Sequence, residues 1–268
     1  SNAGISTTNS FGFNYRDQWS KRISVYGSYS YNHKNTNQLQ NSYETNNTTL
    51  INNNQDLNSL TKGNSHRFTF NFEYQIDSFN YLKVSPSINY SGSDANSQSI
   101  FDYKRPDGTK TLDGSNKNLN GSEAPNLAAT ILYNHKFRKR GRNFSTSITL
   151  GTSQNNSEQD VTNLSTQYQP FTFSRNTFQF TDQENNNYNY GVRFTYSEPI
   201  NKYRSLDFSY SHNLNYGRND RKTFNVDSAT QIKTLNNFLS NDYENNFYNN
   251  RIGVSLRTTK KKYNYTVG

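Results

Sequence analysis

Short turns alternate with long polar segments along this chain, and this alternation limits the folds that the chain can adopt. The short connections fall at 17–22, 78–81, 138–142, 199–205 and 259–262, with centres near 20, 79, 140, 202 and 260. The long polar segments cover roughly 35–64, 92–125, 152–186 and 217–246. The chain therefore repeats a unit of about sixty residues, made of a strand, a short turn, a second strand and a long polar segment.

Between the connections, apolar and polar residues alternate with a period of two, which is typical of strands. The pattern predicts ten strands around 11–15, 23–31, 68–76, 82–90, 127–137, 144–150, 188–196, 206–216, 252–256 and 263–267. One face of the sheet should carry Phe68, Phe70, Phe72, Leu82, Val84, Ile88, Val192, Phe194, Leu206 and Phe208. The other face should carry Thr69, Asn71, Glu73, Ser85, Asn89, Arg193, Asp207 and Ser209.

The unequal connections favour an antiparallel up-and-down meander, in which every second connection lies at the same end. Outer-membrane barrels combine short turns at one end with long loops at the other, whereas a soluble sandwich has no physical reason to do so. Segments such as 68–76 and 82–90 have nine residues, close to the length of a tilted membrane-crossing strand. Because open strand edges cannot remain in lipid, we expect an all-β chain that forms part of a larger transmembrane β-barrel.

Composition is consistent with a barrel wall. Only 30% of residues are hydrophobic and the mean hydropathy is −1.09, values that usually indicate disorder. Aromatic residues nevertheless make up 15% of the chain and gather near the strand ends, where rings favour the headgroup level of a membrane. The net charge of +9 comes partly from basic turns, including Lys136–Arg142 and Lys260–Lys262, and nucleic-acid-binding signatures are missing, so no nucleic-acid partner is expected.

The first three residues, Ser1, Asn2 and Ala3, look like the remnant of a cleaved tag, so the predicted barrel segment covers 4–268. The sequence has no cysteine, which excludes disulfides and thiolate metal sites. No apolar run approaches the 18 residues that a membrane-spanning helix needs.

The segments Gly4–Tyr15, Trp19–Arg22 and Val25–Tyr31 resemble the barrel portion of Bacteroidetes outer-membrane proteins related to TonB-dependent receptors. The resemblance extends over nearly the whole chain through its Tyr-rich strands, Asn-rich connections and basic turns. It implies a role in nutrient uptake across the bacterial outer membrane. It also implies a separate N-terminal plug, a full barrel of 22 strands and a TonB partner. The chain shows neither the plug nor the full number of strands.

Catalysis is not expected. The histidines His33, His66, His135 and His212 lack metal-ligand spacing and are interpreted as polar wall positions. The run Ser209–His212 contains a nucleophile and a base, but alternation places Ser211 and His212 on opposite faces. Asp207 and Glu73 are expected to form hydrogen bonds on the polar face. We predict no catalytic, cofactor-binding or metal-binding residues.

Ligand-binding candidates are confined to the segment 101–116, where Pro106-Asp107-Gly108 signals a turn. This segment could form a small hairpin on an outer loop and present Tyr103 and Arg105 to a ligand. A merely structured loop is the alternative interpretation. The Asn-rich stretches at 46–47, 52–54 and 185–187 are expected to be solvated loops.

The sequence therefore predicts a non-enzymatic segment of a transport-related outer-membrane barrel. Its expected partners are outer-membrane lipid, the rest of the parent barrel with its plug, and the TonB system. Open sheet edges could also pair with a second copy. The alternative hypothesis is a soluble or surface-exposed all-β adhesin or glycan-binding module, which explains the alternation but not the one-sided turns.

Overall fold

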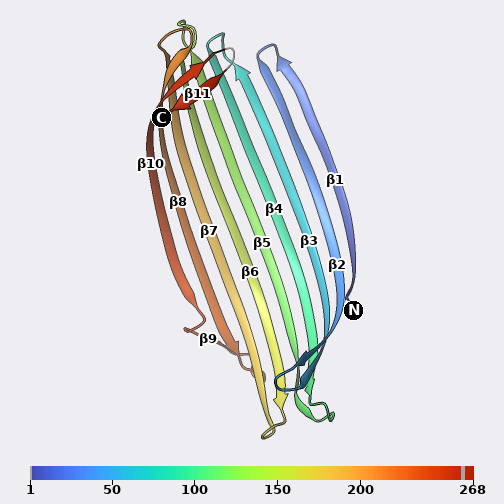
Figure 1. The fold of residues 1–268 in the computed structure, drawn as a ribbon. Coiled ribbons are helices and arrows are strands. Elements are labelled where there is room, and N and C mark those ends of the chain that lie inside the picture. Colours follow the sequence, from blue (N-terminus) through green and yellow to red (C-terminus); the bar gives the residue numbers. More distant parts are fainter. Residues whose placement is uncertain (1, 261–262) are drawn as a thin grey trace.

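The strands that the structure describes form one antiparallel sheet, in which each long strand pairs with the next long strand along the chain (Figure 1). The structure, a computed structural model, describes residues 2–260 and 263–268. The strands are β1 (Asn2–Ser20), β2 (Ile23–Asn46), β3 (Ile51–Gln75), β4 (Asn80–Lys104), β5 (Lys110–Lys136), β6 (Asn143–Gln167), β7 (Phe173–Pro199), β8 (Arg204–Val226), β9 (Lys233–Leu235), β10 (Asn241–Thr259) and β11 (Asn264–Val267).

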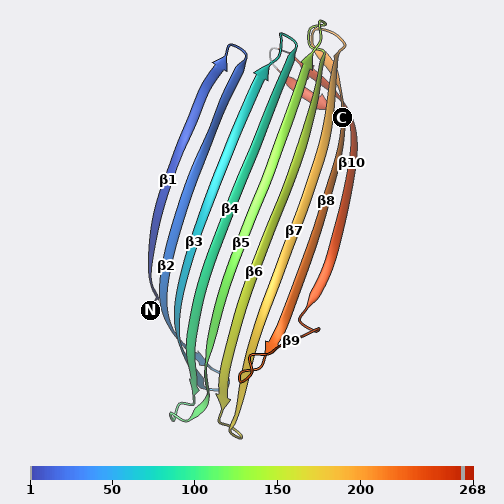
Figure 2. The same cartoon turned by 180° about the vertical axis from the view of Figure 1, so that it is seen from behind.

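The up-and-down meander predicted from the turn spacing is confirmed. The spatial order is β1-β2-β3-β4-β5-β6-β7-β8-β10-β11, so consecutive strands form simple hairpins. The connections after β1, β3, β5 and β7 are short and lie together at one end of the sheet, here called the short-turn end, where β10 also ends and β11 begins (Figures 1 and 2). The sequence pattern missed only β9, three residues that pair with the end of β8.

The polar segments are not long loops, so this expectation was wrong. The strands β1 to β8 and β10 contain 19 to 27 residues each. At the opposite, long-hairpin end the connections shrink to the tips 47–50, 105–109 and 168–172, while the connection 227–240 between β8 and β10 contains β9. The Asn-rich runs 52–54 and 185–187 lie inside β3 and β7. Neighbouring strands extend together, so their backbone N–H and C=O groups pair even where both faces are polar.

The pairing also includes two residues of the expected tag remnant. The backbone of Asn2 pairs with Gln40, and that of Ala3 pairs with Leu39. Strand β1 therefore begins within the expected tag remnant, and Ser1 lies outside the described residues. Backbone hydrogen bonding depends little on side-chain identity, so β1 can extend for as long as β2 offers a partner.

The register confirms the two predicted faces. Paired residues of an antiparallel ladder lie on the same side of the sheet. Phe68 pairs with Ile88, which pairs with Leu127, and Ile148 pairs with Val192 on β7. The register pairs of the other strands place all ten predicted apolar residues on one face, here called the apolar face. They place all eight predicted polar residues on the other face, here called the polar face.

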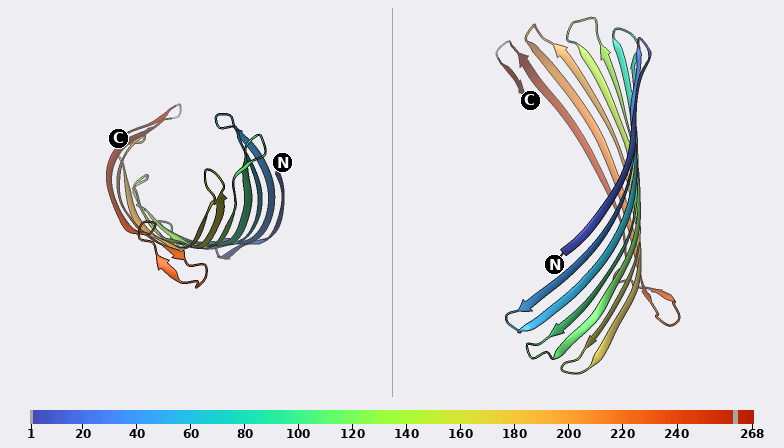
Figure 3. Two further views of the ribbon diagram at one scale, coloured as in Figure 1. Left: turned by 90° about the horizontal axis from the view of Figure 1, so that it is seen from below. Right: turned by 90° about the vertical axis from the view of Figure 1, so that its right-hand side faces the viewer.

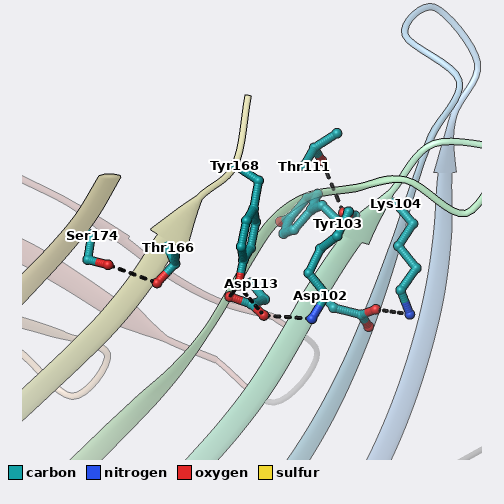
Figure 4. Close-up of polar contacts among 9 residues, drawn as sticks. Asp102, Tyr103, Lys104, Thr111, Asp113, Thr166, Tyr168 and Ser174 are labelled. Carbon is teal, nitrogen blue, oxygen red and sulfur yellow. Dashed lines mark hydrogen bonds and ion pairs between the residues drawn. The ribbon is translucent and has the colours of Figure 1, made fainter. Parts of the chain in front are cut away.

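The sheet is strongly curved, and its polar face is the concave one. Figure 1 looks into the concave side and Figure 2 at the convex side, while Figure 3 shows the arc from below with a gap between β1 and β11. Figure 4 views the long-hairpin end from the convex side, where Asp102 and Asp113 project from the apolar face. No pairing between β1 and the last strands closes this arc in the described part of the chain.

This single curved layer has almost no hydrophobic core. Among the described residues, Val25 is the one apolar side chain that is buried. Apolar residues at the middle of the convex side stay open, with Phe68, Ile88 and Leu150 exposed by 40%, 48% and 47%. Soluble domains bury the apolar face of a sheet against a second layer, and the described residues form a single layer.

The exposed apolar residues form a continuous band near the short-turn end, here called the apolar band. It comprises the convex positions of 11–15, 23–31, 66–74, 82–90, 127–135, 144–152, 188–196, 206–216 and 252–256. No Asp, Glu, Lys or Arg occupies a convex position in these described segments. From Tyr74 to His66 the band measures about 27 Å along the strand, which becomes about 20 Å along a membrane normal after strand tilt.

Candidate functional site on the concave wall

Charge is segregated between the two faces of the strands. Within the described strands, the apolar face carries fourteen carboxylates and eight basic residues, and every one of these lies outside the apolar band. The concave polar face carries three carboxylates, Glu44, Glu73 and Asp207. Its ten basic residues are Arg16, Lys34, Arg67, Lys83, Lys136, Arg175, Arg193, Arg221, Arg251 and Arg257. The concave wall is therefore electropositive.

Two of the concave carboxylates are neutralised by basic partners. The Lys83 ammonium lies 3.1 Å from Glu73, and the Tyr26 hydroxyl donates a hydrogen bond of 2.9 Å to the same carboxylate. Arg257 donates to Asp207 at 3.0 Å, and Ser197 donates to it at 2.6 Å. The expectation that Glu73 and Asp207 form hydrogen bonds on the polar face is confirmed.

Two arginines of the wall lie in one cross-strand row beside a recess of about 410 Å³. Arg193 on β7 and Arg251 on β10 both pair in register with Ser211 on β8. Neither guanidinium takes part in an ion pair within the described chain. The recess is lined by Ser147, Thr149, Gly191, Val192, Arg193, Ser209, Ser211, Asn213, Asn249 and Arg251.

Small residues keep this recess open. A Cβ atom on Gly191 would lie 2.5 Å from the Asn213 amide oxygen and 2.7 Å from the Thr149 hydroxyl oxygen. Any larger residue would therefore displace both polar groups. Apart from Gly191 and Val192, the lining residues carry guanidinium, hydroxyl or amide groups, so the recess offers several hydrogen-bond donors and is suited to a polar, negatively charged ligand.

The sequence matches no protein-family model, and no curated protein matches it either. Among solved structures, the chain is similar to the siderophore receptor PiuA from Acinetobacter baumannii, with a TM-score of 0.44 and 8% sequence identity. The likeness covers 97% of this chain and 47% of that receptor, so the chain spans about half of the receptor's length.

Tyr103 and Arg105, the ligand-binding candidates from the sequence, lie away from this recess. They are at the tip of the β4–β5 hairpin, and Pro106-Asp107-Gly108 does form its turn, with φ of +83° at Gly108. This turn directly connects the two long strands β4 and β5, so the segment is not the expected small hairpin on an outer loop. Tyr103 belongs to the concave face and its ring packs edge-on against Phe101 at 5.9 Å. The ligand role of both residues stays a prediction.

Polar contacts order the convex side of the same tip (Figure 4). Asp102 pairs with Lys104, and Lys110 contacts Asp113 at 2.7 Å. The Tyr168 hydroxyl donates to the same Asp113 carboxylate at 3.2 Å. The hydrogen bond with Lys104 lowers the pKa of Asp102, and the one with Asp113 raises the pKa of Lys110. These partners satisfy one another. The Thr111 hydroxyl also donates to the Tyr103 carbonyl at 3.0 Å, so side-chain contacts tie β4 to β5 and the end of β6 to β5.

The histidines are not on the polar wall, and the interpretation of their positions is corrected. His33, His66, His135 and His212 all share the apolar, convex face by register. Three of them make hydrogen bonds to neighbouring strands: His66 contacts the Tyr29 hydroxyl at 2.9 Å, His135 contacts the Asn80 amide oxygen at 2.6 Å, and His212 contacts the Tyr190 hydroxyl at 3.0 Å. An imidazole with a phenol partner can remain among aromatic rings, because the hydroxyl pairs with one of its ring nitrogens.

Ser211 and His212 do lie on opposite faces, as predicted, so they cannot act on one another. Among the described residues, no three His, Asp or Glu side chains lie close enough to hold a metal ion. Within the same described part, no helix is long and apolar enough to cross a membrane.

An ion-pair network ties the turn 137–142 to the end of β7 at the short-turn end. Arg142 donates to both oxygens of Glu198, at 2.7 Å and 2.8 Å, and Lys139 contacts the same carboxylate at 2.6 Å. The Tyr196 hydroxyl adds a hydrogen bond of 2.7 Å. Together these donors hold the pKa of Glu198 far below its ordinary value of 4.5.

Proposed function

We propose that this chain is a wall segment of a transport-related bacterial outer-membrane β-barrel. The observation that supports it best is the curved single layer whose exposed apolar band lies on the convex side. In water the exposed apolar surface of this band would be unfavourable, whereas in a membrane lipid would cover it. The concave side would then line an aqueous lumen. The aromatic pairs Tyr31–His66 and Tyr188–Tyr216 lie at one border of the band, where interfacial rings are favoured.

The finer assignment follows the resemblance of the sequence to Bacteroidetes barrels related to TonB-dependent receptors. In that assignment the chain acts without catalysis, and the short turns face the periplasm. The parent barrel and plug complete the structure, the TonB system supplies energy, and the long-hairpin end meets the solute. The segregation of charge, with a basic concave wall, supports passage of polar solutes along this face.

Site-directed spin labelling tests the membrane assignment directly, because the chain has no cysteine of its own. The neighbouring pairs Phe70 and Asn71, and Val84 and Ser85, are each changed to cysteine one at a time and labelled in lipid vesicles. Labels at Phe70 and Val84 should be accessible to oxygen dissolved in lipid. Labels at Asn71 and Ser85 should be accessible to a water-soluble nickel complex.

Each pair provides its own control, because its two positions have the same depth and opposite faces. If all four labels are equally accessible from water, the membrane proposal fails. The soluble or surface-exposed all-β module then becomes the better explanation of the alternation.

A further inference from the structure

We propose that Arg193 and Arg251 form an oxyanion-binding site on the concave wall, with Ser211 between them. The ligand carries a phosphate or carboxylate group. Whether such an anion is transported rests on the proposed function. Its binding does not, since the site is built from three neighbouring strands of this chain.

The first argument is geometric. Arg193, Ser211 and Arg251 occupy one cross-strand row of β7, β8 and β10. Adjacent strands lie about 4.8 Å apart, so the two arginine backbones are about 10 Å apart. An extended arginine side chain, including its guanidinium, bridges about half of this distance. The two guanidiniums can therefore approach the same anion above the short Ser211 side chain.

The second argument is electrostatic. The acidic groups nearest to this row on the concave face already have partners: Asp207 is held by Arg257 and Ser197, and Glu73 is held by Lys83. In the described chain no carboxylate forms an ion pair with Arg193 or Arg251. Two like charges in one row repel one another, and an oxyanion between them converts this repulsion into attraction.

The third argument is the surroundings of the pair. The next row toward the long-hairpin end contains Thr149, Gly191, Asn213 and Asn249. The recess of about 410 Å³ beside them is large enough for a small organic acid or a phosphate ester. Hydroxyl and amide donors complete the hydrogen bonding of an oxyanion whose charge the arginines neutralise.

Calorimetric titration of the whole folded chain in nonionic detergent tests the proposal. Inorganic phosphate and succinate are the two probes, and they distinguish a phosphate site from a carboxylate site; glucose serves as a neutral control. The double variant Arg193→Gln/Arg251→Gln should weaken binding of the preferred anion by about tenfold or more. The double variant Arg67→Gln/Arg221→Gln removes the same charge from the same face, outside the recess, and should change binding by about twofold or less.

A second variant keeps the test decisive if the double arginine variant fails to fold. Ser211→Asp places a carboxylate between the two guanidiniums, so it should retain the fold and abolish binding of both probes. Equal weakening by the two double variants would mean a diffuse charge effect and would overturn the site. Absence of binding to phosphate and to succinate in the unaltered chain would overturn it as well. Neither result bears on the spin-label test, so the site and the membrane assignment can fail separately.

Discussion

At the scale of single residues, position within the two-residue period decides what a side chain experiences. Neighbours such as Phe70 and Asn71 lie at one depth but on opposite faces. Asn71 accepts a hydrogen bond of 2.8 Å from Ser85 on the polar side. Val84 pairs with Phe72 and Ile131 on the apolar side. The same chemical change should therefore have unequal costs at adjacent positions.

Arginine substitutions measure this difference in lipid vesicles that contain the intact parent barrel. Phe70→Arg or Val84→Arg should lower the free energy of unfolding by about 2–4 kcal/mol near the bilayer midplane, because a charge would face hydrocarbon. Asn71→Arg and Ser85→Arg should cost much less, roughly the 0.5–1.5 kcal/mol of a lost hydrogen bond, because the concave side is wet. Equal costs at the two faces, measured by denaturant titration, would contradict the assignment of the band to lipid.

At the scale of strands, pairing extends far beyond the apolar band. Asn52 to Leu60 of β3 pair with Lys104 to Asn96 of β4, although polar residues predominate in both segments. Cross-strand contacts such as Thr45 to Asn52, at 2.9 Å, add support near the tip. These segments gain little from apolar burial, so their order depends on the backbone ladder and on neighbours of equal length.

Hydrogen exchange should reveal this ladder. Amides of 52–60 and 95–103 donate within strands, so they should exchange much more slowly than amides of the tip 47–50. They should still exchange faster than those of the apolar band, since lipid or detergent covers only the band. Exchange in 52–60 as fast as in the tip would restore the original expectation of solvated loops. Mass spectrometry of peptides from the detergent-solubilised chain provides the measurement.

At the scale of the whole molecule, the sheet has two open edges. Among the described residues, strand β1 pairs only with β2, and the last long strand, β10, pairs beyond its β8 side only with the four residues of β11. The outer backbone groups of β1 are therefore available to another strand. The exposed apolar band is a second reason for self-association, because exposed apolar surfaces associate with one another in water.

Sedimentation should show both effects on the purified chain. In plain buffer the chain should self-associate into polydisperse species. In detergent above its critical micelle concentration it should sediment as small, defined complexes, because micelles cover the band. A monodisperse monomer in plain buffer would count against the membrane proposal and favour the soluble module.

The sequence alone determined the strands, their order and their two faces. Period-two patterning places residues such as Phe68 and Thr69 on opposite sides wherever the backbone is extended. Turn spacing near sixty residues then orders the hairpins, because short connections allow only antiparallel neighbours. The sequence also located the turn at Gly108 and the pairing tendency of Asp207 and Glu73.

The tertiary structure alone decided how far the strands extend, which residues form rows across them, and which face is concave. The composition of polar segments such as 52–60 does not distinguish a paired strand from a loop. What distinguishes them is the presence of a partner strand. The row of Arg193, Ser211 and Arg251 depends on the register between three strands, and a shift of one residue would send each side chain to the other face. Ten strands can be recognised along the chain, but their alignment arises only when neighbouring ladders pair.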